Sequence, residues 1–118
     1  MLMNLRFDCV FYSVSDMDRA VLFYADLLGL QLVSRDAVAR FDLDGVLLEL
    51  VPANGALPAA GQGNARLCLR VADMAQARAE LLARGVATSE PQDKENGRLC
   101  SLRDPDGNEI CLWEYSRT

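Results

Sequence analysis

One pattern of apolar and polar positions occurs twice along this chain. Residues 9–17 read CVFYSVSDM and residues 66–74 read RLCLRVADM, so each stretch ends in Val, one small residue, Asp and Met. Apolar residues at alternate positions followed by an aspartate predict a strand that leads into a helix, because the carboxylate can accept from the first free amides of the helix. Each copy continues to an Asp-Gly turn, at residues 44–45 and 106–107, and a further apolar strand. The chain is therefore predicted to contain two copies of one structural unit.

A helix is predicted after the first strand of each copy. The first begins at Ser15 or Asp16 and ends at Gly29, and the second begins at Asp73 and ends at Gly85. Glycine permits the left-handed backbone with which many helices end. Each helix carries one apolar stripe at helical spacing, which is expected to face the core. The stripes comprise Met17, Ala20, Val21, Tyr24, Leu27 and Leu28 in the first helix and Met74, Ala77 and Leu81 in the second.

Three short strands, separated by turn-forming residues, are predicted after each helix. They span 30–34, 38–43 and 46–51 in the first copy and 86–89, 98–103 and 109–115 in the second. Each copy thus has the order βαβββ, and the fold class is α+β. Residues 1–118 are expected to form a single domain. Within it the first module occupies about 7–51, a linker rich in Pro, Gly and Ala spans 52–64, and the second module occupies about 65–115.

The alternation of side chains along the strands sorts them onto two faces of sheet. One face is apolar apart from a phenol and is expected to pack beneath the helices: Val10, Tyr12, Val14, Leu48, Leu50, Leu67, Leu69, Val71, Ile110 and Leu112. The other mixes large apolar groups with charges and thiols: Cys9, Phe11, Ser13, Leu47, Glu49, Val51, Arg66, Cys68, Arg70, Glu109, Cys111 and Trp113. Such a mixture is typical of a ligand-binding cleft, and a sheet face that is wetted or covered by another chain is the alternative.

The composition excludes several classes of function. The chain has no histidine, which removes catalysis and metal binding by imidazole. Its net charge of −5 opposes phosphate backbones, so nucleic acid is not expected as a partner. No apolar run approaches the roughly 18 residues that a membrane span needs, so no membrane partner is expected. The four cysteines lack CxxC spacing and the N-terminus lacks a signal-peptide pattern, so we expect a cytoplasmic protein with reduced thiols.

Taken together, these features resemble the vicinal oxygen chelate superfamily, which includes glyoxalase I, extradiol dioxygenases, fosfomycin-modifying enzymes and bleomycin resistance proteins. The resemblance covers about residues 7–115 and rests on the paired βαβββ halves and the two aspartate helix starts. It also rests on Phe23-Tyr24 before Leu28-Gly29-Leu30 and on the sequence DPDGN at 104–108, a hairpin-turn signal favoured over a metal loop. The resemblance implies two modules that form a curved mixed sheet around a cleft, often in a homodimer. It does not imply one reaction, because this fold hosts many.

The resemblance also implies where a metal ion is held in the metal-dependent members. The four corresponding positions here are Cys9, Glu49, Arg66 and Cys111, of which only Glu49 matches the usual ligand. Arginine stays protonated and has no lone pair to donate, so Arg66 would repel a divalent cation and is expected to pair with Glu49. A metal-free small-molecule-binding protein, for a drug or a metabolite and with no cofactor, is therefore the favoured interpretation.

Two enzymatic alternatives stay open. Cys9, Glu49 and Cys111 could hold zinc or iron as a divalent metal cofactor, for glyoxalase-like lyase or isomerase chemistry or for dioxygenase-type chemistry. Glu49 could instead act as a base without metal, with Arg66 stabilising an anionic intermediate.

Under the binding interpretation, each polar or aromatic group on the mixed face has a role. Phe11 and Trp113 would stack on a planar ligand, and Glu49 and Glu109 would accept hydrogen bonds from its cationic groups. Arg66 and Arg70 would bind its carboxylate or carbonyl oxygens. The expected ligand-binding residues are Cys9, Phe11, Glu49, Arg66, Arg70, Glu109, Cys111 and Trp113. The expected partners are this ligand and a second copy of the chain.

Overall fold

The computed structural model describes residues 3, 6–53, 55 and 66–116, so most of the predicted linker lies outside the described residues. The first module contains β1 (Cys9–Val14), α1 (Met17–Val21), the π-helix η1 (Leu22–Leu27), β2 (Gln31–Arg35), β3 (Ala39–Leu43) and β4 (Val46–Pro52). The second contains β5 (Leu67–Arg70), α2 (Met74–Ala83), β6 (Gln92–Lys94), β7 (Gly97–Arg103) and β8 (Glu109–Tyr115). The two modules repeat the same order of elements, as the sequence predicted.

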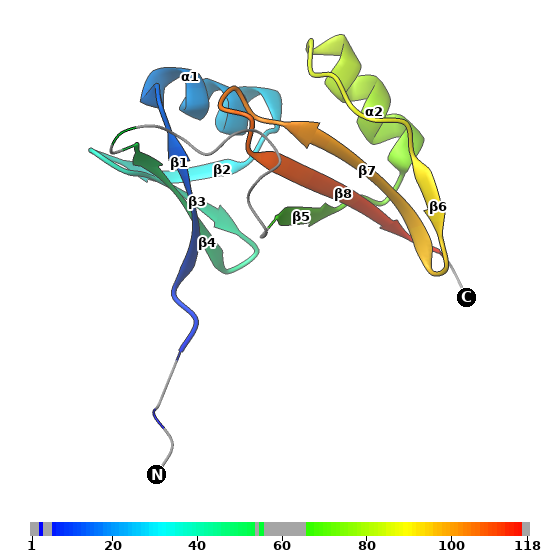
Figure 1. Cartoon of the computed structure of the whole chain (residues 1–118), viewed down its shortest axis with the longest axis horizontal. Helices are drawn as coiled ribbons and strands as arrows, with labels where there is room; N and C mark the ends of the chain where they lie inside the picture. The colour runs from blue at the N-terminus through cyan, green and yellow to red at the C-terminus, as the bar shows by residue number, and fades with distance from the viewer. Residues whose placement is uncertain (1–2, 4–5, 54, 56–65, 117–118) are drawn as a thin grey trace.

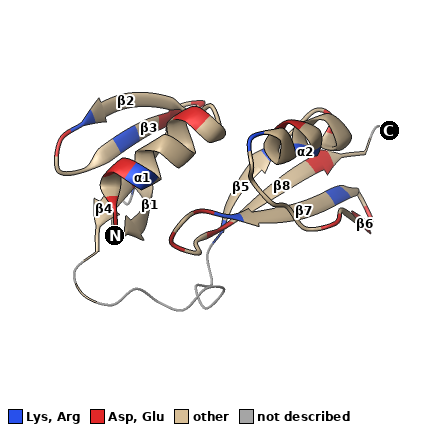
Figure 2. Ribbon diagram, turned by 90° about the horizontal axis from the view of Figure 1, so that it is seen from above, with Lys and Arg blue, Asp and Glu red and all other residues tan. Residues whose placement is uncertain are grey.

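Each module is a four-stranded mixed sheet with its helix on one face. The strand orders are β1-β4-β3-β2 and β5-β8-β7-β6, in which the first two strands of each sheet are parallel and the other neighbours antiparallel. The α+β class is confirmed. The helices lie on the same side of the two sheets (Figure 1), and the modules lie side by side (Figure 2). No helix of the described residues covers the opposite face of either sheet (Figure 1).

The predicted helix starts are confirmed. The carboxylate of Asp16 accepts from the backbone N of Arg19 at 3.1 Å, and that of Asp73 accepts from the backbone N of Gln76 at 3.0 Å. The first helix widens into η1, where Leu28 N donates to the carbonyl five residues back at 2.9 Å. The apolar stripe predicted a regular helix and did not reveal this change. No helix in the described part of the chain is long and apolar enough to cross a membrane.

The predicted strand at 86–89 is wrong. This segment runs beside β7 outside any strand, and Ser101 N donates to the side-chain oxygen of Ser89 at 2.9 Å in place of a backbone acceptor. The edge strand of this sheet is instead β6, which forms later in the chain. Its position is set by the turn at residues 95–96, which places Lys94 opposite Gly97. The turn residues, not the apolar character of 86–89, therefore fix the position of the edge strand.

The core lies between the helices and the faces of the sheets that they cover. The face assignment from alternation is confirmed, because Val14, Leu48, Leu50, Leu67, Ile110 and Leu112 are all buried. Tyr12, the one polar member of that face, is half-buried between the modules. Its hydroxyl accepts from Leu67 N at 2.7 Å and donates to the carbonyl of Glu109 at 3.1 Å. Tyr12 thus joins β1 to β5 and β8.

The predicted hairpin turn at 104–108 also joins the modules. Asp104 is buried, and its carboxylate accepts from the Tyr24 hydroxyl at 2.7 Å, from the backbone N of Asp106 and Asn108 at 2.9 and 2.8 Å, and from Asn108 Nδ2 at 2.8 Å. The next carboxylate, that of Asp106, accepts from the hydroxyl and backbone N of Ser15. In Figures 1 and 2 the turn reaches from β7 and β8 toward α1. The carboxylates of this motif therefore hold the two modules together.

Candidate functional site

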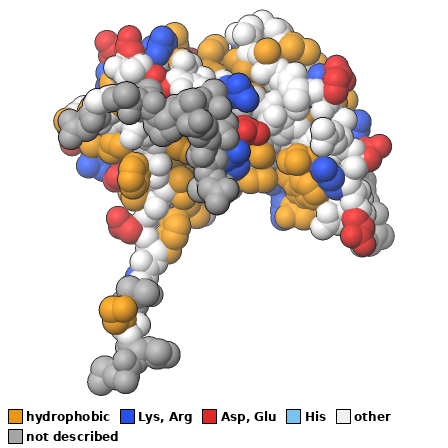
Figure 3. Space-filling view, in the orientation of Figure 1, with side chains coloured by type: hydrophobic (Ala, Val, Ile, Leu, Met, Phe, Trp, Pro, Cys, Tyr) orange, Lys and Arg blue, Asp and Glu red, His pale blue; other side chains and the backbone are white. Residues whose placement is uncertain are grey.

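The mixed face that the sequence singled out is the side of both sheets turned away from the helices, and we call it the open face. Its members are half-buried or exposed, and Phe11 reaches 60% exposure. Figure 3 shows hydrophobic side chains gathered among charged ones over the second module. Large apolar groups are thus presented to solvent beside charged ones, which is the chemical character that a cleft for a small molecule needs.

In the first module, the open face centres on Glu49. This residue on β4 lies in register with Phe11 on β1 and with Arg40 on β3. Arg40 Nε lies 3.2 Å from Glu49 Oε2, and Arg40 Nη1 lies 3.4 Å from Asp36 Oδ2. Partial burial, together with the negative charges of Glu49 and Asp8, raises the pKa of the Cys9 thiol. Glu49 is therefore held in an ion pair, and Cys9 stays a neutral thiol at pH 7.

In the second module, the open face carries a ladder of cross-strand pairs between β5 and β8. Arg66 Nε lies 3.1 Å from Glu109 Oε2 where the two strands begin. Cys68 then pairs with Cys111, and Arg70 with Trp113. The guanidinium carbon of Arg70 lies 4.7 Å from the centre of the Tyr115 ring, and that ring meets Trp113 edge-on at 5.5 Å. An ion pair, two thiols and a cation–aromatic cluster follow one another along this face.

The predicted ion pair between Glu49 and Arg66 is wrong for the described part of the chain. Glu49 pairs with Arg40 and Arg66 pairs with Glu109, each within its own sheet. The alternation of side chains placed Glu49 and Arg66 on one face but could not fix how the two sheets lie relative to each other. Arg40 is the residue that sequence reasoning missed. The signal was present, because the Asp44-Gly45 turn sets Leu43 opposite Val46 and therefore residue 40 opposite residue 49.

The residues at the metal positions do not fit a divalent ion. Within the described ranges, no three Cys, Asp or Glu side chains gather closely enough to hold a metal. Cys9, Glu49 and Cys111 do not form such a group within these described residues. The carboxylates that a cation would need are already in ion pairs with guanidinium groups, in Arg40–Glu49 and Arg66–Glu109.

The Trp113 side chain is packed against its own sheet and is only partly free to stack on a ligand. Its indole packs against β7 at Gly97, where an added Cβ would lie 3.2 Å from Trp113 Cε2 and 2.2 Å from the Glu114 carbonyl oxygen. The indole Nε1 is buried without an acceptor among the described residues. The ring is half-buried, so one part of it remains available on the open face.

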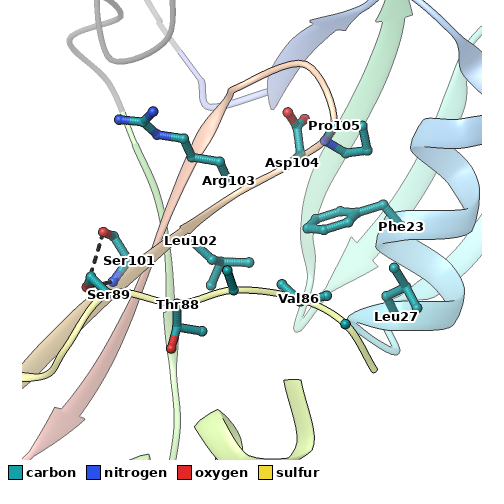
Figure 4. Close-up of a pocket in the computed structure, with 12 residues that line it drawn as sticks. Phe23, Leu27, Val86, Thr88, Ser89, Ser101, Leu102, Arg103, Asp104 and Pro105 are labelled. Carbon is teal, nitrogen blue, oxygen red and sulfur yellow. Dashed lines mark hydrogen bonds between the residues drawn. The ribbon is translucent and has the colours of Figure 1, made fainter. Parts of the chain in front are cut away.

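Two cavities in the described part of the chain lie largely away from the open face. One, of about 520 Å³, lies between η1, the segment after α2 and β7, where Phe23, Leu27, Val86 and Leu102 project into it (Figure 4). The other, of about 500 Å³, lies between the modules near the end of η1 and α2. Of the predicted ligand-binding residues, Arg70 alone lines one of these two cavities. The other predicted ligand-binding residues line neither of these two cavities.

Comparison with known proteins identifies the relatives of this fold. A family model described as a glyoxalase-like domain matches residues 9–113. No curated protein is similar enough to the chain to count as a match. TnmS3, an antibiotic binding protein from Streptomyces sp. CB03234, is 30% identical over 98% of this chain and 100% of its own, with a TM-score of 0.74.

Two further solved structures widen the comparison. A glyoxalase/bleomycin resistance protein from the same Streptomyces sp. CB03234 is 30% identical over 91% of this chain and 100% of its own, with a TM-score of 0.68. The lactoylglutathione lyase of Agrobacterium tumefaciens is 20% identical over 92% of each chain, with a TM-score of 0.73. The lyase shares the fold, whereas the two Streptomyces proteins also share a larger part of the sequence.

Proposed function

The chain belongs to the glyoxalase-like domain family of the vicinal oxygen chelate superfamily, and from that premise we propose that it is a metal-free binding protein for a small molecule, a drug or a metabolite. The ligand lies on the open face. Its contacts are to Phe11 and Trp113 through stacking and to the charged groups of the two ion pairs through hydrogen bonds.

The ion pairs on the open face carry this proposal. The positions that hold metal in the metal-dependent members of the superfamily include Arg66 here, and a guanidinium has no lone pair for a metal. Glu49, the one matching ligand, is engaged by Arg40 at 3.2 Å. A divalent ion at Glu49 would have to displace the Arg40 guanidinium, so the Coulomb attraction within that ion pair opposes its binding.

The same ion pairs define the class of ligand. Arg40–Glu49 and Arg66–Glu109 present donors and acceptors side by side at partly exposed positions. A planar ligand that carries both a cationic group and a carboxylate or carbonyl oxygen can exchange partners with such a pair and keep every charge hydrogen-bonded. Phe11, 60% exposed next to Glu49, supplies an apolar surface for its ring. The antibiotic-binding relative at 30% identity supports this choice.

A homodimer in the cytoplasm completes the proposal. A small-molecule site normally buries most of its ligand in a concave pocket, and of the predicted ligand-binding residues only Arg70 lines either of the two cavities. A second copy of the chain that covers the open face would supply the missing walls. The four cysteines are free, as the reducing cytoplasm requires.

A thermal-shift screen of planar cationic and zwitterionic compounds tests the binding function. A ligand at about a hundred times its Kd stabilises the folded protein by about 2.7 kcal/mol. Phe11→Ala is expected to abolish the shift. Phe7→Ala, at an even more exposed phenylalanine outside the strands, is expected to keep it. A ligand whose shift is unchanged by Phe11→Ala, Glu49→Gln and Arg66→Ala would contradict the proposed site.

A further inference from the structure

The open face of the second module brings two thiols together. Cys68 on β5 and Cys111 on β8 are direct partners in the parallel pairing of these strands, and both are free. Neighbouring strands lie about 4.8 Å apart. That spacing falls inside the range of about 4.4–6.8 Å between Cα atoms over which two cysteines can be bridged. Because cross-strand partners point to the same face, their sulfur atoms are within reach of a single bridging atom.

The surroundings of the pair favour a soft ligand that needs only two protein sulfurs. Cys68 is exposed and Cys111 is half-buried, so an incoming molecule reaches both from the open face. The other neighbours of Cys111 are Ser101 on β7 and the Arg66–Glu109 ion pair at the preceding position of the ladder. Structural zinc needs four ligands, and no group of even three Cys, Asp or Glu gathers in the described ranges.

We propose that Cys68 and Cys111 form a dithiol site for trivalent arsenicals, soft electrophiles that bind two thiols and keep their third substituent. With a monosubstituted arsenical in its dihydroxy form, each thiol replaces one hydroxyl group on arsenic. Two S–H and two As–O bonds break, two As–S bonds form, and each proton leaves with a hydroxyl as water. Arsenic remains trivalent, so the step needs neither an oxidant nor a reductant.

The pairing of the two strands carries this assignment. Cys68 and Cys111 are direct partners on one face of the sheet, so a chelating atom finds both thiols already placed when the second As–S bond forms. The site depends on the register of β5 and β8 and not on the ligand of the proposed function.

Phenylarsine oxide is the probe, added to the reduced full-length protein and followed by intact mass and by thiol titration. We expect one adduct per chain and the loss of two titratable thiols. The second As–S bond forms intramolecularly, so Cys68→Ser and Cys111→Ser are each expected to need at least about 100-fold more arsenical for half-saturation. Cys9→Ser is the matched control, because it removes a thiol of the open face that has no cysteine opposite it.

Each result of the phenylarsine oxide experiment either supports the dithiol site or overturns it. An adduct that resists 2-mercaptoethanol but is removed by the same concentration of 2,3-dimercaptopropanol, and that persists in Cys9→Ser and Cys100→Ser, supports the site. No adduct in the wild-type protein, or equal affinity in wild type and Cys68→Ser, overturns it. Cys68→Ala provides a second variant at an exposed position, and the melting temperature of each variant shows that the comparison is made between folded proteins.

Discussion

Replacing Tyr24 by Phe removes one hydrogen bond between the modules and leaves the ring in place. Tyr24 is fully buried, and its hydroxyl donates to Asp104 Oδ2 at 2.7 Å across 80 residues of sequence. Asp104 keeps three other donors, so the loss is that of one hydrogen bond to a charged group, about 1.5–3 kcal/mol. The packing of the ring against Phe23 and Phe41 is preserved in the variant.

Urea denaturation of wild type, Tyr24→Phe, Asp104→Ala and the double variant measures this hydrogen bond. The free energy of unfolding is expected to fall by about 2 kcal/mol in Tyr24→Phe with an unchanged dependence on urea, and the double-mutant cycle should give a coupling energy of about 1.5–3 kcal/mol. Tyr115→Phe, at an exposed tyrosine, is the control and should change stability by less than about 0.5 kcal/mol. A coupling energy near zero would refute the idea that this contact joins the modules.

Two further predictions concern pH and packing. Burial, with the charge of Asp104, raises the pKa of Tyr24, so above about pH 10 the unfolded state loses a proton that the folded state keeps. The free energy of unfolding should therefore fall as the pH rises, and in Tyr24→Phe this fall should be smaller by about 1.4 kcal/mol in total between pH 9 and about 11. Identical slopes in urea melts between pH 9 and about 11 would contradict it. Gly97→Ala should lower the free energy of unfolding by about 1–3 kcal/mol, because the added Cβ meets the Glu114 carbonyl. It should also shift the fluorescence of Trp113, the single tryptophan. An unchanged spectrum and an unchanged melting temperature would contradict this prediction.

Properties that depend on local periodicity could be predicted from the sequence. Once residues 9–14 are taken as a strand, the alternation of side chains alone assigns Tyr12 and Val14 to the core face and Phe11 to the open face. The structure agrees with this assignment. The aspartate helix starts are local for the same reason, since the carboxylate of Asp16 or Asp73 bonds an amide three residues away. The α+β class followed from the order of these elements.

Properties that depend on register or on distant contacts could not be predicted in the same way. The partner of Arg66 is set by how β5 lies against β8, and no periodicity within either strand contains that offset. The partner of Glu49 can be predicted locally, because a two-residue hairpin fixes its pairing with Arg40, and the predicted pair with Arg66 disregards this register. The edge strand was misplaced because its position follows from the turn before Gly97 and not from the apolar residues at 86–89.

Metal binding by the purified protein tests the central claim most directly. Equilibrium dialysis against Mn²⁺ and Ni²⁺, followed by elemental analysis, is expected to show far less than one ion per chain, and Glu49→Gln should leave that value unchanged. Zn²⁺, dialysed in parallel with Cys68→Ser, separates binding by the thiol pair from binding at Glu49. One tightly held Mn²⁺ or Ni²⁺ per chain that is lost in Glu49→Gln would contradict the account.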